Sequence, residues 1–280
     1  MAASGQLRMS VSTLDQVLMG SYSLVRRSGL LETPIGRKLF RSAYFLYKRY
    51  IEDDLQSLVG SRPALVHGGN VLDIGANIGF TATVLARATE PGYQVYAFEP
   101  EPHNFATLQE TANRRTFESK IIAVPCAVGA EEGTVELWQN LCHHADHRVI
   151  TDQFRLAVSD VAGITVPMIS IDQFLARNPG PVSFVKIDVQ GFELPVCQGM
   201  SRTLEMNRDL TIVLEYAPVA MRNLGFDPSL LIDFLARRGF QIYEVLPKGE
   251  LSPGIPPDLP DTDYVDLLFS RRPLAFGKPK

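Results

Sequence analysis

Several residue types and patterns are scarce in this chain of 280 residues, and each scarcity excludes a class of protein. The three cysteines, Cys126, Cys142 and Cys197, stand far apart without a Cys-x-x-Cys pair, so neither a disulfide framework nor a thiolate zinc site is expected. No apolar run approaches the roughly 18 residues of a membrane span, and the first 25 residues lack the apolar core of a secretory signal. We therefore expect a cytoplasmic protein without a transmembrane segment.

Positive charge is also in short supply. The formal net charge is -4 and the pI is about 5.8, whereas general nucleic-acid binders carry a strong basic bias, so no nucleic-acid partner is expected. The first 50 residues are the exception, with eight Lys and Arg against Asp15 and Glu32. This basic stretch is compatible with a transit peptide, a surface for anionic lipid or substrate, or the solvated face of leading helices, and the last is favoured.

Hydrophobic patterning changes character along the chain. A broad apolar stripe predicts a helix over residues 34–59, and from Asn70 onward short apolar runs alternate with amphipathic stretches. That alternation is typical of an α/β fold with a doubly wound, mostly parallel sheet. Seven strands are predicted, and the last, reached without a crossover helix, should be antiparallel. The predicted strands are 70–74, 94–98, 121–125, 183–188, 210–215, 240–245 and 264–269, and the predicted helices are 79–89, 101–115, 192–206 and 228–238.

Two segments extend this pattern. Residues 1–62 are predicted to form an N-terminal helical extension, acting either as a lid or as a homodimer contact, and residues 63–280 to form the ligand-binding domain. Within that domain, an insertion at 129–182 should hold a short strand at Thr134–Trp138, a His-rich loop, an extended stretch at Ile164–Met168 and a helix from about Ser170.

The strongest motif joins the first predicted strand to the helix that follows it. Asp73 ends the strand, and Gly75 and Gly79 follow as the chain turns into the helix. Ligands bind at this edge of open α/β sheets, where glycine lets the backbone approach and helix N–H groups are exposed. Twenty residues after Gly79, Glu99 ends the second strand, where an acid accepts hydrogen bonds from ribose hydroxyls. The three-glycine dinucleotide fingerprint is absent, so no pyrophosphate site is expected.

A second motif, Lys186-Ile187-Asp188-Val189-Gln190-Gly191-Phe192-Glu193, ends the fourth of these strands. Strand alternation places Lys186 and Asp188 on one face, so Asp188 is expected to meet a second substrate, with a helix N-cap as the alternative. Glu215 ends the next strand and should lie beside Asp188. Two such carboxylates can bind Mg²⁺, can position and deprotonate a hydroxyl, or can form an ion pair with Lys186.

Three of the five histidines fall between Cys142 and Arg148 in the insertion. A histidine can accept a proton from a hydroxyl at neutral pH, and His147 beside Asp146 is the first candidate for that role. A solvent-exposed loop without chemistry is an equally compatible interpretation, and the spacing matches no familiar metal-binding histidine pair.

Together, Asp-x-Gly-Ala-Asn-x-Gly, Phe-Glu-Pro and the motif ending in Glu193 resemble the FkbM family of class I methyltransferases over about residues 70–216. The resemblance implies a Rossmann-like seven-stranded sheet, S-adenosylmethionine as methyl donor and a hydroxyl acceptor on a sugar or natural product. The family more often has Glu where this chain has Gln190. A nicotinamide-dependent oxidoreductase and a non-catalytic binding protein on the same fold stay open as alternatives.

Site residues follow from the resemblance and from the motifs. By resemblance, the methionine part of the cofactor would lie against the turn after the first strand, the ribose against Glu99, and the adenine against Ala127 and Val128, for which a tight turn is the alternative. The full set of expected cofactor-binding residues is Asp73, Gly75, Ala76, Asn77, Gly79, Glu99, Pro100, Ala127, Val128 and Asp188. The expected catalytic residues are His147, Asp188, Lys186 and Glu215, and Asp188 and Glu215 are the ligands expected for Mg²⁺.

Overall fold

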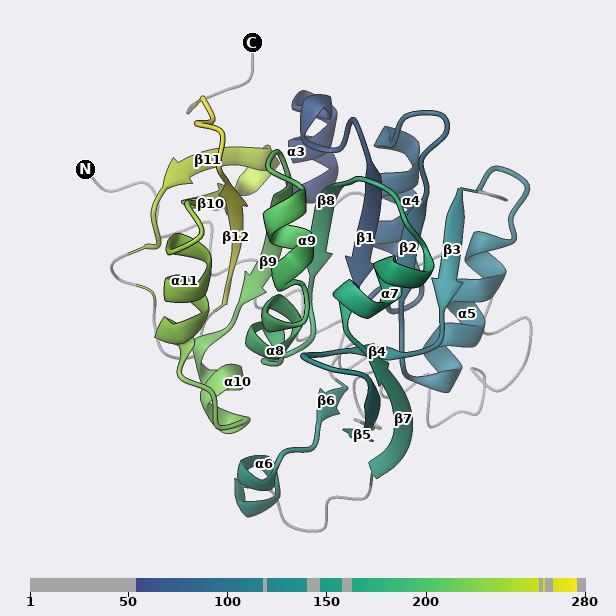
Figure 1. Ribbon diagram of the computed structural model, residues 1–280, viewed down its shortest axis with the longest axis vertical. Helices are drawn as coiled ribbons and strands as arrows, with labels where there is room; N and C mark the ends of the chain where they lie inside the picture. Colours follow the sequence, from purple (N-terminus) through teal and green to yellow (C-terminus); the bar gives the residue numbers. More distant parts are fainter. Residues whose placement is uncertain are drawn as a thin grey trace. The chain divides into compact units, whose positions relative to one another are not determined.

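Eight strands form the central sheet of the computed structural model, which describes residues 54–117, 120–139, 147–157, 163–256, 259 and 264–275 (Figure 1). Most of the helix predicted over 34–59 therefore lies outside the described residues. The sheet order is β11-β10-β12-β9-β8-β1-β2-β3. The strands are β1 (Asn70–Ile74), β2 (Val95–Phe98), β3 (Ile121–Val124), β8 (Val182–Ile187), β9 (Thr211–Tyr216), β10 (Gln241–Leu246), β11 (Glu250–Pro253) and β12 (Val265–Ser270).

Strand directions confirm the mostly parallel sheet. The strands from β9 to β3 pair in parallel, whereas β12 is antiparallel to both β9 and β10, as predicted for the last strand. Seven strands are predicted for this sheet, and the structure has eight. The chain folds back through η3 (Pro247–Gly249), where Lys248 and Gly249 adopt positive φ angles of 65° and 70°, and β11 adds to the edge of the sheet. Burial of Leu251 stabilises this extra hairpin.

The helices mostly follow the prediction, with one break. The predicted helix 192–206 is two helices, α8 and α9, because the chain turns at Gly199, where any side-chain Cβ would overlap the carbonyl oxygen of Gly129. A short helix, α10, was not predicted. The helices that flank the main sheet are α3 (Asp54–Ser61), α4 (Phe80–Ala88), α5 (Pro102–Ala112), α8 (Glu193–Gln198), α9 (Ser201–Met206), α10 (Pro218–Asn223) and α11 (Pro228–Ala236). No described helix is long and apolar enough to cross a membrane.

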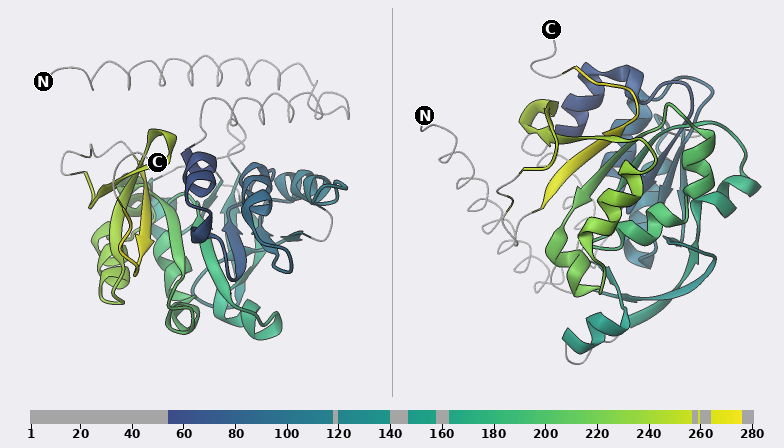
Figure 2. Two further views of the ribbon diagram at one scale, coloured as in Figure 1. Left: turned by 90° about the horizontal axis from the view of Figure 1, so that it is seen from above. Right: turned by 60° about the vertical axis from the view of Figure 1, so that its left-hand side comes forward.

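Helices cover both faces of the sheet (Figure 2), and a separate apolar core lies on each face. Leu72 and Ile74 belong to the core shared with α8, α9 and α11, whereas Val71 belongs to the core shared with α3, α4 and α5. Because side chains alternate along a strand, Asp73 lies on the same face as Val71. The same alternation places Lys186 with Phe184 on that face, so the charged residues near the strand ends share one side of the sheet.

The insertion builds a second sheet at the end of the domain toward which β1, β8 and β9 point (Figure 1). Its order is β4-β7-β5-β6, with strands β4 (Ala127–Val128), β5 (Gly133–Trp138), β6 (Arg148–Val149) and β7 (Gly163–Ile169). The short helix α6 (Asp152–Ala157) follows β6, and α7 (Ile171–Arg177) begins at Ser170 with a capping box. The strand and helix predicted here are confirmed, and Ala127 and Val128 lie in a strand and not in a tight turn.

Candidate functional site

The turn after β1 places backbone close to a second loop. Gly75, Asn77 and Gly79 all have positive φ angles, of 81°, 50° and 89°. The N–H groups of Gly75 and Ala76 donate to the carbonyl of Phe98 at 3.1 and 2.9 Å, which fixes the turn against the end of β2. A Cβ on Gly75 would overlap the carbonyl oxygen of Asp188. Glycine at this position therefore lets the loops after β1 and β8 meet.

Asp73 is completely buried, yet within the described residues neither of its carboxylate oxygens has a hydrogen-bond partner of normal geometry. Burial raises its pKa from 3.8 to about 6, although the facing Lys186 on β8 and, less strongly, the backbone N–H of Ala82 act to lower it. A buried acceptor without well-placed donors is costly, since such a group loses the hydrogen bonds it made to water. The site therefore suits a ligand that brings N–H donors or positive charge to Asp73.

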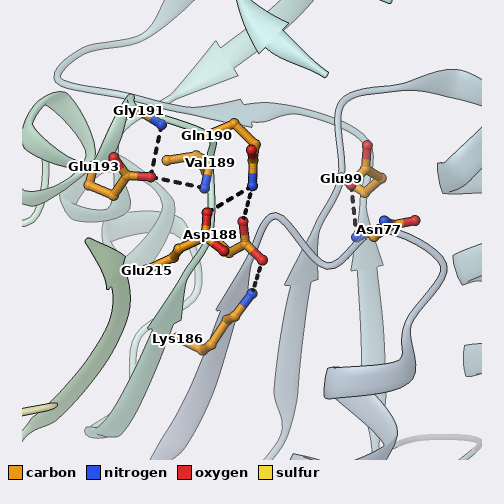
Figure 3. Close-up of polar contacts among 9 residues, drawn as sticks. All are labelled: Asn77, Glu99, Lys186, Asp188, Val189, Gln190, Gly191, Glu193 and Glu215. Atoms are coloured by element: carbon orange, nitrogen blue, oxygen red, sulfur yellow. Dashed lines mark hydrogen bonds and ion pairs between the residues drawn. The ribbon is translucent and has the colours of Figure 1, made fainter. Parts of the chain in front are cut away.

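Glu99 links β2 to the same turn. Its Oε2 accepts the N–H of Asn77 at 2.9 Å (Figure 3). Its Oε1 accepts the N–H of Glu101, also at 2.9 Å. Burial raises the pKa of Glu99 to about 8, more than the two backbone N–H groups lower it. Each carboxylate oxygen keeps a second lone pair, so the side chain can still accept a hydroxyl donor. The expected ribose residue is thus held rigidly beside the turn, with Pro100 directly after it.

A hydrogen-bonded network joins the ends of β8 and β9 (Figure 3). Lys186 Nζ donates to Asp188 Oδ2 at 2.9 Å, and Gln190 Nε2 donates both to Asp188 Oδ1 at 2.9 Å and to Glu215 Oε1 at 3.1 Å. Burial acts to lower the pKa of Lys186, but the carboxylates of Asp188 and Asp73 outweigh it and hold that pKa above its usual value. The adjacency of Asp188 and Glu215 and the ion pair with Lys186 are both present.

The Mg²⁺ expectation is not supported by this donor set. The group that reaches both Asp188 and Glu215 is an amide NH₂, and the second oxygen of Asp188 faces an ammonium; both are hydrogen-bond donors, whereas Mg²⁺ needs oxygen ligands. Across the described ranges, no cluster of three His, Cys, Asp or Glu side chains has the arrangement of a metal site.

Sequence reasoning missed two acids near this network. The fully buried Glu193 accepts the N–H groups of Gly191 and Val189 at 3.1 and 3.3 Å, and burial raises its pKa to about 7. Its position in the first turn of a predicted helix was a signal that it could bind backbone N–H groups. Asp266 faces Glu215 across β12 and β9. Burial, then the charge of Asp188 and then that of Asp266 raise the pKa of Glu215 well above 4.5. Only the strand register reveals that pair.

The remaining expected residues lie on the second sheet. Ala127 and Val128 are buried in β4, and His147 directly precedes β6 with a half-buried side chain. Asp146 lies outside the described residues. At the end of β5, Gln139 Nε2 donates to Glu101 Oε1 at 2.8 Å, so the second sheet is tied to the chain two residues beyond Glu99.

Comparison with known proteins agrees with these features. Over residues 73–242 the chain matches the model of the methyltransferase FkbM domain. It is 27% identical over 135 residues to the hexuronic acid methyltransferase AglP of Haloferax volcanii, covering 48% of this chain and 50% of that protein. It is 39% identical over 93 residues to the 31-O-demethyl-FK506 methyltransferase FkbM of Streptomyces tacrolimicus, covering 32% of this chain and 33% of that protein.

The chain thus spans half or less of the length of these curated relatives. A solved structure of methyltransferase FkbM from Methylobacillus flagellatus aligns with a TM-score of 0.47 at 22% identity, covering 72% of this chain and 43% of that one. Because the family match covers well over half of the sequence, including the turn after β1 and the network at β8 and β9, the chain belongs to the FkbM family of methyltransferases.

Proposed function

We propose that this protein is an S-adenosylmethionine-dependent O-methyltransferase that acts on a hydroxyl of a sugar or natural product. The observation that carries the proposal is Asp73, a buried carboxyl without a well-placed hydrogen-bond donor at the foot of a left-handed glycine turn. The ammonium of S-adenosylmethionine would supply the N–H donors that Asp73 lacks, and its sulfonium would add positive charge. The names of the two curated relatives, a hexuronic acid methyltransferase and a 31-O-demethyl-FK506 methyltransferase, favour such acceptors.

The cofactor would lie across the carboxyl ends of β1 and β2. The backbone from Gly75 through Gly79 and the carboxylate of Asp73 would hold the methionine end, with Asp188 beside it. Glu99, positioned by the N–H of Asn77, would accept the ribose hydroxyls, and Pro100 would close that edge. Ala127 and Val128 are buried, so adenine would contact the backbone of β4 more than its side chains.

S-adenosylmethionine supplies a methyl group on a positively charged sulfur, and the chain must then orient an acceptor oxygen and receive its proton. Lys186 and Gln190 each donate to Asp188 and fix the position of its carboxylate, so we assign it the orientation of the acceptor. Glu215 and His147 are the candidates for receiving the proton. Positioning of the two reactants can lower the activation barrier by about 7–11 kcal/mol, whereas a general base accelerates the reaction by about 10²–10⁴-fold. Orientation of the acceptor should therefore contribute more than the base.

Isothermal titration calorimetry tests the proposal against its rivals. We expect S-adenosylmethionine and S-adenosylhomocysteine to bind and NAD not to bind, because the turn lacks the third glycine of a pyrophosphate site. Preferential binding of NAD would favour the oxidoreductase. If none of these three compounds binds, a non-catalytic protein would be favoured. With binding established, mass spectrometry of products from a panel of sugars and secondary metabolites would identify the acceptor.

Residues 1–62 are proposed to form a helical extension that serves as a lid or as a dimer contact. Sedimentation of the full chain separates the two roles, since a dimer contact predicts twice the monomer mass and a lid does not require it.

A further inference from the structure

The turn that connects β8 to α8 has an unusual backbone. Gln190 adopts a positive φ of 54° and Gly191 one of 104°, and residues other than glycine rarely adopt such angles. Glu193 holds the turn in place by accepting the N–H groups of Val189 and Gly191. Only glycine fits at position 191, because a Cβ there would lie 2.7 Å from the carbonyl of Ala220. This backbone directs the Gln190 side chain back over the strand ends.

The Gln190 amide is shared between two carboxylates. Its Nε2 lies 2.9 Å from Asp188 Oδ1 and 3.1 Å from Glu215 Oε1 (Figure 3). An amide nitrogen carries two protons, so one can be donated to each carboxylate. The opposite orientation of the amide would place its oxygen against two carboxylate oxygens, which repel it. The contacts therefore define which end of the side chain faces the pair.

This bridge takes the place that a cation would otherwise fill. Two neighbouring carboxylates repel each other, and proteins commonly relieve such repulsion by protonation or by a bound metal ion. Here Lys186 neutralises one side of Asp188, and Gln190 supplies donors to the remaining oxygen of Asp188 and to Glu215. The pair can thus stay together without a metal ion.

We propose that Gln190 is a positioning residue that makes the Asp188–Glu215 pair independent of divalent cations. The inference rests on the proposed methyl transfer only for its effect on turnover, because the bridge itself exists without substrate. Replacing the amide by a carboxylate removes both donors and adds a carboxylate that can reach both Asp188 and Glu215, so that a cation between these side chains would meet three carboxylates in place of two. Gln190→Glu should therefore create a weak divalent-cation site.

The test uses the full chain and Mn²⁺ as the probe, with free Mn²⁺ followed by electron paramagnetic resonance at neutral pH. We expect Gln190→Glu to bind Mn²⁺ at least about tenfold more tightly than the wild type. Gln198→Glu is the matched control, since it makes the same chemical change on an exposed side chain of α8. Wild-type methyl transfer to any acceptor found in the panel should be unchanged by EDTA.

Gln190→Met provides a second variant that keeps the chain length and removes both donors without adding charge. We expect its kcat to fall by about tenfold while the Kd for S-adenosylmethionine changes less than twofold, because the residues proposed to hold the methionine end and the ribose lie mainly in the segments after β1 and β2. A purely structural role would lower cofactor affinity and Tm together with kcat.

Three results would overturn the inference: Mn²⁺ binding by the wild type as tight as by Gln190→Glu, loss of transfer in EDTA that Mg²⁺ restores, or wild-type kcat in Gln190→Met. If Gln190→Glu fails to fold, the last two measurements decide. Failure of the wild type to bind S-adenosylmethionine would instead remove the proposed function and leave the Mn²⁺ comparison valid.

Discussion

The substitution Asp73→Asn tests two claims separately: that burial of this carboxyl lowers the stability of the protein, and that the carboxyl binds the cofactor. An acid whose pKa is higher in the folded than in the unfolded chain binds its proton more tightly when folded. Its contribution to stability is therefore fully present below the unfolded pKa and is lost as the pH rises through the folded pKa. For Asp73 these pKa values are 3.8 and about 6.

The magnitude follows from the shift of about two units, each unit corresponding to about 1.4 kcal/mol. At pH 8 the carboxyl is ionised in both states, and the folded protein is destabilised by about 3 kcal/mol relative to acid pH. At pH 5 the destabilisation of the folded protein has reached only about half of this value. The asparagine variant lacks this dependence, so its free energy of unfolding relative to the wild type should rise by about 1.5 kcal/mol between pH 5 and pH 8.

Urea unfolding at the two pH values measures this difference, in which any pH-independent cost of burying the asparagine amide cancels. Asp152→Asn, on an exposed side chain, controls for the substitution itself. Calorimetry on the same samples should show affinity for S-adenosylmethionine reduced by at least about tenfold, since a charge-assisted hydrogen bond is lost. A difference in free energy of unfolding between Asp73→Asn and the wild type that does not change with pH would refute the burial argument. An unchanged affinity of the variant for S-adenosylmethionine would refute the cofactor role of Asp73.

Three further substitutions test separate contacts. Gly75→Ala should lower the free energy of unfolding in chemical denaturation by at least about 2 kcal/mol more than the control Gly239→Ala. Both glycines have a φ near 80°, but a Cβ at Gly75 would overlap the carbonyl oxygen of Asp188, whereas nothing lies within 4 Å of a Cβ at Gly239. Equal losses of stability would mean that the close approach to Asp188 is unimportant. Lys186→Met should cost about 2 kcal/mol of stability because Asp188, which is 32% exposed, loses its hydrogen bond from the ammonium, and an unchanged urea midpoint would contradict this. His147→Ala should leave the Kd for S-adenosylmethionine intact and reduce kcat by about 10²-fold or more, and unchanged turnover would remove His147 from the mechanism.

Local sequence determined much of the fold and the cofactor side of the candidate site. Buried parallel strands are rich in apolar residues, which is why Val71, Leu72 and Ile74 and the run Ile212–Leu214 marked β1 and β9 correctly. A turn that must adopt positive φ needs glycine or asparagine, so the spacing of Gly75, Asn77 and Gly79 indicates a ligand turn by itself. These features depend on a few neighbouring residues.

The three-dimensional structure decided what depends on contacts between distant segments. The break between α8 and α9 arises from the approach of Gly129 to Gly199, 70 positions apart in the chain. The pairing of Asp266 with Glu215 depends on the register of β12 against β9, and the double hydrogen bond of Gln190 depends on where β8 and β9 end relative to each other. Sequence thus determined which residues stand at the strand ends. Tertiary structure decided which of them share a hydrogen-bond donor, because register and loop packing are set by the whole sheet.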